Sequence, residues 1–172
     1  MNAIEVNSLT KQFGSSKAVD NISFAVKEGE IFGFLGPNGA GKSTTMMILT
    51  TLLKPTSGEA LVGGYNVVSE AKKVREKIGY VQQEISVDEF LTGRENLYLH
   101  ARINQIPNNL IKSRIDEVLE LVELDEKQDE ASLTYSGGMR KRLDIANGLL
   151  SRPAVLFLDE PTVGLDIQTR RK

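Results

Sequence analysis

The sequence of 172 residues contains no cysteine, and its only histidine is His100. The lack of cysteine excludes a disulfide scaffold, thiolate metal sites and a cysteine nucleophile. Long apolar runs are also missing, since none approaches the roughly 18 residues that a membrane-spanning helix needs. The first residues, 1–5, show no basic stretch typical of a signal peptide. We therefore expect a soluble, cytoplasmic chain that reaches a membrane only through a partner, with His100 at the surface or boundary of a helix.

Neither sign of charge dominates the sequence. Lys and Arg number 21 against 23 Asp and Glu, which gives a formal net charge of −2. A chain that binds nucleic acid through a general basic field would show an excess of positive charge. Hydrophobic residues make up 40% of the chain, enough for a core. The composition predicts one ordinary globular domain, or one with a small insert, and no nucleic-acid partner.

The spacing of apolar residues predicts alternating strands and helices. Alternation over residues 22–27 is typical of a half-buried strand, and unbroken apolar runs at 31–35 and 155–158 predict strands covered on both faces. Short strands are also expected at 60–62 and 78–81. Helices are expected from near Lys42 to before Pro55, at 69–78 with Ser69 as N-cap, at 92–103 behind a capping box, at 111–122, at 139–150 and from Ile167 onward.

A glycine-rich loop separates the predicted strand at 31–35 from the next helix. Residues 36–43, GPNGAGKS, fit the pattern G-x-x-x-x-G-K followed by Ser or Thr. Glycines let successive N–H groups turn inward around an anion, and the following helix adds positive charge at its N-terminus. A turn that merely links strand and helix is the alternative, but a chance match in this context is rare.

This loop predicts binding of a nucleotide triphosphate. Lys42 supplies a cation for the β- and γ-phosphates, and the Ser43 hydroxyl is a ligand for Mg²⁺. The residues expected at the nucleotide are Gly36, Pro37, Asn38, Gly39, Ala40, Gly41, Lys42, Ser43 and Thr44.

Two acidic residues, Asp159 and Glu160, follow the apolar run at 155–158. Alone, this pattern is most often a strand end capped by solvated acids. Beside a phosphate loop it favours a site, because the carboxyl ends of parallel strands share one edge of a sheet, where ligands bind. Asp159 is then expected to hold Mg²⁺, and Glu160 to accept a proton from an attacking water.

Further along the chain, several motifs together resemble the nucleotide-binding domain of ABC transporters. Residues 135–139, YSGGM, are similar to the signature motif of that family. Gln83 corresponds to its Q-loop glutamine, Asp166 to its D-loop, and Phe13 to an aromatic residue that stacks on adenine. The resemblance runs from about residue 4 to the end, with all motifs in the family's order.

The resemblance implies ATP and Mg²⁺ as ligands, ATP hydrolysis, and several residue roles. Gln83 is implied to contact Mg²⁺ or water. Ser136, an expected N-cap, together with Gly137 and Gly138 would form a second anion site, which in the family contacts ATP held by another copy in a head-to-tail homodimer. A polar loop residue at Gln83, an ordinary capped turn at 136–138, a core aromatic at Phe13 and an N-cap at Asp166 remain the alternatives.

The resemblance also implies a fold class and a domain organisation. We expect an α/β protein with a P-loop NTPase core, N-terminal antiparallel strands and a helical insert. Residues 1–83 would form the nucleotide-binding core with its β-subdomain, and 84–145 the helical subdomain. Residues 146–172 would continue the core with the acidic strand and D-loop, ending before the family's switch histidine. We therefore expect a C-terminally truncated chain that binds ATP but hydrolyses it poorly.

The sequence departs from the family pattern at three positions. Tyr135 and Met139 replace the usual leucine and glutamine of the signature, a form similar to that of drug-resistance ATPases. This predicts an exporter subunit, peripheral on the inner face of the cell membrane, that binds a polytopic membrane permease. Gln82 stands where proline is common, which leaves the register of the Q-loop open by one residue. A non-transport ABC ATPase and a non-catalytic nucleotide-binding module are the competing hypotheses.

Overall fold

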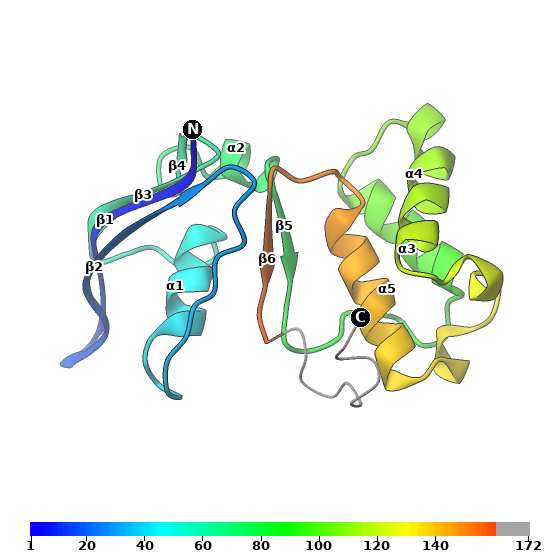
Figure 1. Ribbon diagram of the computed structural model, residues 1–172, viewed down its shortest axis with the longest axis horizontal. Coiled ribbons are helices and arrows are strands. Elements are labelled where there is room, and N and C mark those ends of the chain that lie inside the picture. Colours follow the sequence, from blue (N-terminus) through cyan, green and yellow to red (C-terminus); the bar gives the residue numbers. More distant parts are fainter. Residues whose placement is uncertain (161–172) are drawn as a thin grey trace. The chain divides into compact units, whose positions relative to one another are not determined.

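A computed structural model describes residues 1–160 of the chain (Figure 1). It divides into two compact units, Met1–Ile78 and Gly79–Lys172, and each is considered separately below. Asp166 and the helix expected from Ile167 lie outside the described residues.

The first unit is built on a four-stranded antiparallel sheet with the strand order β2-β1-β3-β4. Strand β1 (Asn2–Phe13) lies between β2 (Ser16–Lys27) and β3 (Ser57–Val62), and β3 pairs with the short β4 (Tyr65–Asn66). Apolar side chains of β1 and β3 are buried beside the apolar residues of one helix. The expected N-terminal antiparallel strands are confirmed, and the strand predicted at 60–62 is the end of β3.

The helices of the first unit are shorter than predicted. Helix α1 (Lys42–Leu49) contacts β2 and β3 and ends before Leu52, because Thr51 adopts a left-handed φ of 66°. Helix α2 (Ala71–Arg75) has Glu70, and not Ser69, at its N-cap position, without a side-chain capping hydrogen bond. The amide of Ser69 instead donates a hydrogen bond of 3.0 Å to Asn66 Oδ1, so this residue belongs to the preceding turn.

The strand predicted at 31–35 is wrong for the described structure, where these residues form no strand. Phe32 stacks on Phe24 of β2 with ring centroids 5.4 Å apart, and Phe34 packs edge-on against both rings. Ile31 and Leu35 are 101% and 93% exposed. The apolar run therefore makes aromatic contacts without the backbone ladder that a buried strand requires.

The second unit begins with a two-stranded sheet of β5 (Ile78–Val81) and β6 (Val155–Leu158). The two strands run in the same direction in Figure 1, and both match the sequence prediction. A Cβ at Gly79 would lie only 2.2 Å from the carbonyl oxygen of Gly148. Glycine on β5 therefore permits a close approach of the last helix to the sheet.

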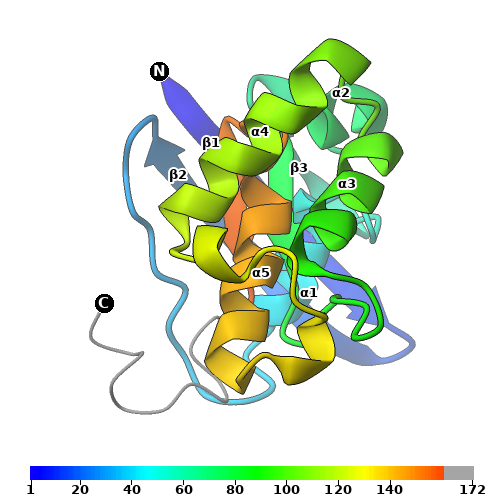
Figure 2. The ribbon, with the colours of Figure 1, turned by 90° about the vertical axis from the view of Figure 1, so that its right-hand side faces the viewer.

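Three helices and two 3₁₀ turns complete the second unit. The helices are α3 (Gly93–Ile103), α4 (Asn108–Leu121) and α5 (Gly137–Leu149), and all three contact one another, as Figure 2 makes visible. The turns are η1 (Asp125–Lys127) and η2 (Ser132–Thr134). These helices agree with the predictions at 92–103, 111–122 and 139–150.

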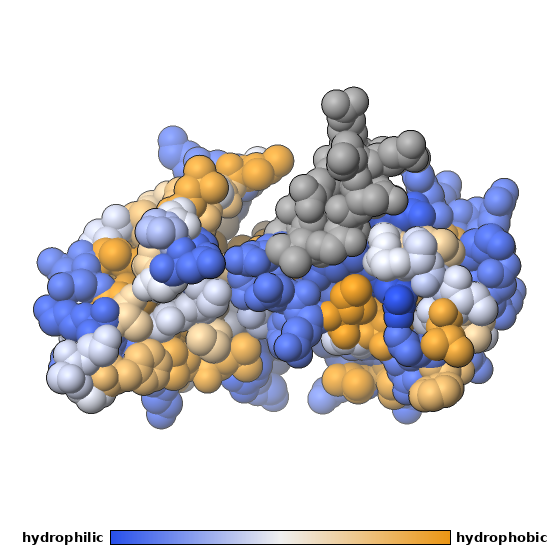
Figure 3. All heavy atoms as spheres, turned by 90° about the horizontal axis from the view of Figure 1, so that it is seen from below, coloured by the Kyte–Doolittle hydropathy of each residue, from blue (hydrophilic) through white to orange (hydrophobic). Residues whose placement is uncertain are grey.

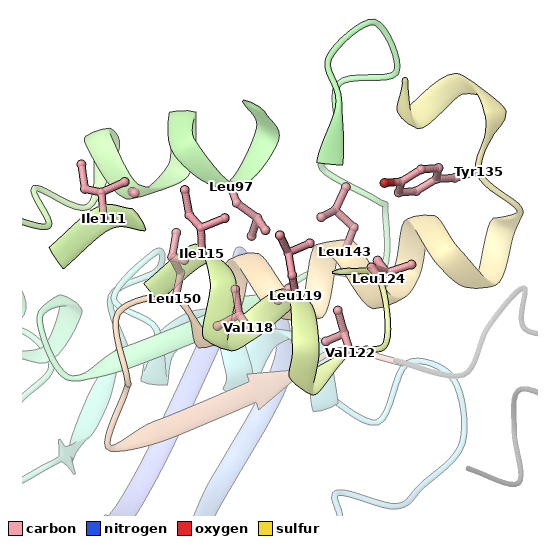
Figure 4. Packing of buried hydrophobic residues seen from close by; sticks show 12 residues of the cluster. Leu97, Ile111, Ile115, Val118, Leu119, Val122, Leu124, Tyr135, Leu143 and Leu150 are labelled. Atoms are coloured by element: carbon pink, nitrogen blue, oxygen red, sulfur yellow. The ribbon is translucent and has the colours of Figure 1, made fainter. Parts of the chain in front are cut away.

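The core of this unit lies between the helices (Figure 4). Its members are the apolar residues that recur at helical spacing, together with the segment between α4 and α5. The buried cluster comprises Leu97, Ala101, Ile111, Ile115, Val118, Leu119, Val122, Leu124, Tyr135, Leu143, Ala146 and Leu150. The predicted capping box is also present, since Thr92 and Glu95 exchange side-chain and backbone hydrogen bonds at the start of α3. Among the described residues, no helix is both long and apolar enough to cross a membrane.

Candidate functional site

The glycine-rich loop of the first unit leads directly into α1. The amide of Ala40 donates to the carbonyl of Pro37, which makes a turn, and Gly41 occupies the N-cap position with a φ of 87°. A Cβ at Gly41 would lie 2.2 Å from the carbonyl oxygen of Ala18. Only glycine fits this position, because both the left-handed backbone and the close strand exclude a side chain.

The N-terminus of α1 is open to an anion. Gly41 offers no side-chain cap, and the first turn of the helix has no acidic residue. The N-terminal N–H groups and the helix dipole together amount to about half a positive charge at this end. Residues 36–40 are exposed, so a phosphate chain can reach the loop from solvent.

The ammonium group of Lys42 folds back over the loop. Its Nζ donates to the carbonyl oxygens of Gly36 at 2.8 Å and Pro37 at 2.9 Å. These are neutral acceptors, and an anionic phosphate oxygen would compete favourably for the same donor. The loop, the uncapped helix and this cation together fit the phosphates of a nucleotide.

Hydroxyl and carboxylate oxygens that suit Mg²⁺ are present in both units. Ser43, on the first turn of α1, is exposed. Within residues 1–160, no three His, Cys, Asp or Glu side chains gather closely enough to hold a metal ion by themselves. Mg²⁺ commonly takes one or two protein oxygens and completes its shell with waters and nucleotide phosphates. The Ser43 hydroxyl in the first unit and the Asp159 carboxylate in the second are each oxygen donors of the kind that Mg²⁺ takes.

The two predicted acids lie at the end of β6 in the second unit. The amide of Asp159 donates a 2.9 Å hydrogen bond to the carbonyl of Val81, and its side chain is half-buried. Burial, and then the nearby carboxylate of Asp159, raise the pKa of Tyr80 above its usual value. Glu160 is exposed and has a left-handed φ of 47°. A non-glycine residue in that region is strained, a feature that recurs at functional sites.

Gln83 and Asp159 follow the carboxyl ends of β5 and β6, the two paired strands of the second unit. Gln83 follows β5 by two residues, and Asp159 bonds to Val81, the last residue of that strand. The side chain of Gln83 is exposed. Gln83 and Asp159 thus follow the two strands of one small sheet, whereas the strand at 31–35 that was expected beside the acidic strand is not formed.

Ser136 begins α5 as its N-cap, as predicted. Its Oγ accepts a 3.2 Å hydrogen bond from the amide of Met139, and both Ser136 and Gly137 are exposed. The two unusual neighbours turn inward: Tyr135 is buried in the helical core, and Met139 packs against it. Tyr135 and Met139, which replace the usual leucine and glutamine, therefore contribute to the packing of the helices. The turn at Ser136 and Gly137 stays exposed, so the N-terminus of α5 is accessible.

Phe13 is not a core residue, because it ends β1 and is 50% exposed. Lys11 Nζ lies 5.0 Å from the centroid of its ring. His100 lies half-buried on α3, as expected for a boundary position.

Two buried charged residues, Lys141 and Asp144, contact the loop beside Gln83 and were missed by the sequence prediction. Their spacing is that of an ordinary surface ion pair on a helix, so the sequence alone could not distinguish them.

A protein-family profile described as ABC transporter matches residues 19–163. The chain belongs to the ABC transporter family. It is 46% identical over 171 residues to the doxorubicin resistance ATP-binding protein DrrA of Mycobacterium tuberculosis, covering 98% of this chain and 52% of that protein. It is 42% identical over 167 residues to the linearmycin resistance ATP-binding protein LnrL of Bacillus subtilis, covering 97% and 54%.

A solved ATP-binding cassette, described as a dimer in a post-hydrolysis state bound to ADP and phosphate, has a TM-score of 0.82 and 30% identity to this chain. The match covers 98% of this chain and 78% of that one. The α/β fold class with a P-loop NTPase core is thereby confirmed for this ABC family member. The chain spans about half the length of the curated relatives it matches.

Proposed function

We propose that this chain binds ATP with Mg²⁺ and forms part of the ATPase subunit of an ABC exporter. The observation that carries the proposal is the loop before α1, where the Lys42 ammonium group donates to the Gly36 and Pro37 carbonyls and the helix N-terminus has no side-chain cap. The exporter assignment is supported by the similarity to resistance proteins named for doxorubicin and linearmycin.

In the proposed complex, Lys42 exchanges its two backbone acceptors for phosphate oxygens. Gly36, Pro37, Asn38, Gly39, Ala40, Gly41, Ser43 and Thr44 surround the phosphates, and Phe13 offers an exposed ring face to the adenine. Ser43, Gln83 and Asp159 hold Mg²⁺, which when bound neutralises phosphate charge. Glu160 accepts the proton of an attacking water.

A second copy of the chain is proposed to complete the nucleotide site. Ser136, Gly137 and Gly138 present an exposed helix N-terminus that suits the terminal phosphate of ATP held by a partner, in a head-to-tail homodimer. ATP binding would close this dimer and hydrolysis would reopen it. Asp166, which lies outside the described residues, is proposed to contact nucleotide at the same interface.

The domain roles are proposed as 1–83 for the nucleotide core, 84–145 for the helical subdomain and 146–172 for the core continuation. The helical subdomain would receive the membrane permease, which holds the protein at the inner face of the membrane. Exposed large apolar side chains on this segment support that role, among them Phe90, Ile103 and Leu121. Hydrophobic patches interrupt the hydrophilic surface of the helical unit on the face drawn in Figure 3.

We also propose that the 172-residue chain hydrolyses ATP poorly. This leaves non-catalytic nucleotide binding as a second function for the chain.

The test is isothermal titration calorimetry with ATP and Mg²⁺. Lys42→Ala should lose at least about tenfold in affinity, because it removes a charge-assisted hydrogen bond to phosphate. Lys17→Ala is the matched control, since Lys17 is an exposed lysine of the same unit paired with Asp20. Equal affinities of the wild type and Lys42→Ala would remove the phosphate loop from the proposal.

A further inference from the structure

Two opposite charges are buried inside the helical unit. Lys141 and Asp144 are one turn apart on α5, and each side chain is only 2% exposed. Their Nζ and Oδ2 atoms are 3.4 Å apart. Removing two charges from water costs several kcal/mol per ion, and one long contact does not offset that cost unless further hydrogen bonds satisfy both groups.

Both groups find those further hydrogen bonds in one short segment, residues 82–86. Lys141 Nζ donates to the carbonyl oxygen of Gln82 at 2.7 Å. Asp144 Oδ1 accepts from the Ser86 hydroxyl at 2.6 Å and from the Ser86 amide at 3.2 Å. The pair therefore forms hydrogen bonds to the backbone on both sides of Gln83, while the side chain of Gln83 itself is exposed.

The segment that follows this loop is also bound to α5 and to the turn before it, through Glu89. Arg140 forms an ion pair with Glu89, and the amide of Leu133, just before α5, donates 2.8 Å to the Glu89 carbonyl. Because Ser136 is the N-cap of α5, the exposed turn at the N-terminus of this helix and the Gln83 loop are attached to the same element.

We propose that Lys141 and Asp144 are positioning residues, which fix the loop carrying Gln83 to the helix that begins at Ser136. This rests on the proposed function, in which Gln83 contacts Mg²⁺. An apolar pair at these positions would pack without the cost of buried charge, but it could not bind the Gln82 carbonyl or the Ser86 amide. The two charged side chains therefore fix the position of residues 82–86 and do not stabilise the helix.

The test replaces both charges together, in the variant Lys141→Met/Asp144→Leu. Lys127→Met/Glu130→Leu is the control, since Lys127 and Glu130 form an ion pair of the same spacing with half-exposed side chains. Three quantities are measured: amide hydrogen exchange at residues 82–86, ATP affinity with and without Mg²⁺, and the urea midpoint of unfolding.

In the buried-pair variant we expect the Ser86 amide to exchange at least about tenfold faster, because its acceptor is gone. The gain in ATP affinity on adding Mg²⁺ should shrink severalfold, while Mg²⁺-free affinity stays at the wild-type value because the phosphate loop is untouched. The urea midpoint should not fall, since an apolar pair replaces a buried ion pair. The control should match the wild type in all three quantities.

Wild-type exchange and wild-type Mg²⁺ dependence in the folded buried-pair variant would overturn the proposal. If that variant does not fold, Ser86→Ala decides, because it keeps both buried charges and removes only the hydroxyl that donates to Asp144. Faster exchange at residues 82–86 in Ser86→Ala then supports the proposal, and unchanged exchange overturns it. A wild type that binds no ATP would contradict the proposed function alone, because the exchange measurement needs no nucleotide.

Discussion

The hydroxyl of Tyr135 donates a 2.6 Å hydrogen bond to the backbone carbonyl of Lys127. This bond joins the residue before the Ser136 turn to the 3₁₀ turn η1. Tyr135 is 3% exposed, and a Cβ at Gly93 would lie 2.6 Å from the same hydroxyl. Tyr135 is therefore fixed by a hydrogen bond and by close packing inside the second unit.

Tyr135→Phe should lower the free energy of unfolding by about 1 kcal/mol, because the Lys127 carbonyl loses one of its two donors and keeps only the Glu130 amide. Urea denaturation followed by circular dichroism measures the change. Tyr98→Phe is the control, since Tyr98 is an exposed tyrosine of α3 and should show no loss. Equal losses in the two variants would contradict the role given to the Tyr135 hydroxyl.

His100 should make the fold less stable in mild acid. Burial lowers the pKa of His100 below its usual 6.5, although the carboxylate of Asp144 and the backbone of Ser86 act in the opposite direction. The unfolded chain then binds more protons than the folded chain as pH falls through 6.5, so the free energy of unfolding decreases in that window. Well above pH 6.5 the imidazole is neutral in both the folded and the unfolded chain, so His100 no longer makes the free energy of unfolding depend on pH.

His100→Gln tests this pH dependence. Its free energy of unfolding should change less than that of the wild type between pH 7.5 and 5.5, both measured by urea denaturation. Carboxylates such as Glu95, whose pKa is lowered by the Thr92 backbone and hydroxyl, lose their contribution only below about 4.5 and affect both proteins equally. Parallel pH profiles for the two proteins would refute the assignment to His100.

Glu160→Gln should separate binding from cleavage. A glutamine keeps the shape of the side chain but cannot accept the proton of an attacking water, so single-turnover ATP cleavage should fall by about a hundredfold or more. ATP affinity should remain unchanged, because the proposed phosphate contacts come from residues 36–44 and the substitution leaves them intact. Cleavage at the wild-type rate, however slow, would remove Glu160 as the base.

The features that the sequence predicted well are local ones. Three of them depend on residues only three or four positions apart: the capping box at Thr92 and Glu95, the N-cap at Ser136 and the apolar stripe of α4. The sequence of each segment is therefore enough to predict them. The loop before α1 is also local, because Lys42 donates to the carbonyl of Gly36 six residues earlier, and its binding of phosphate stays a prediction.

The features that the sequence could not predict depend on distant partners. The run at 31–35 has the composition of a buried strand, but composition does not supply the neighbouring strands, and the segment instead packs against Phe24. Lys141 and Asp144 have the spacing of a solvent-exposed pair, but in the folded chain both are buried and hydrogen-bonded to residues 82–86. Tertiary contacts, rather than local preference, decide these cases.

The most direct test of the central claim is an NMR titration of the wild-type chain with ATP and Mg²⁺, observed at the backbone amides. The account predicts that the amides of residues 38–44 shift first and most, and that Lys42→Ala abolishes those shifts. If ATP leaves these amides unmoved while the protein is folded, the loop before α1 does not bind nucleotide and the account is contradicted.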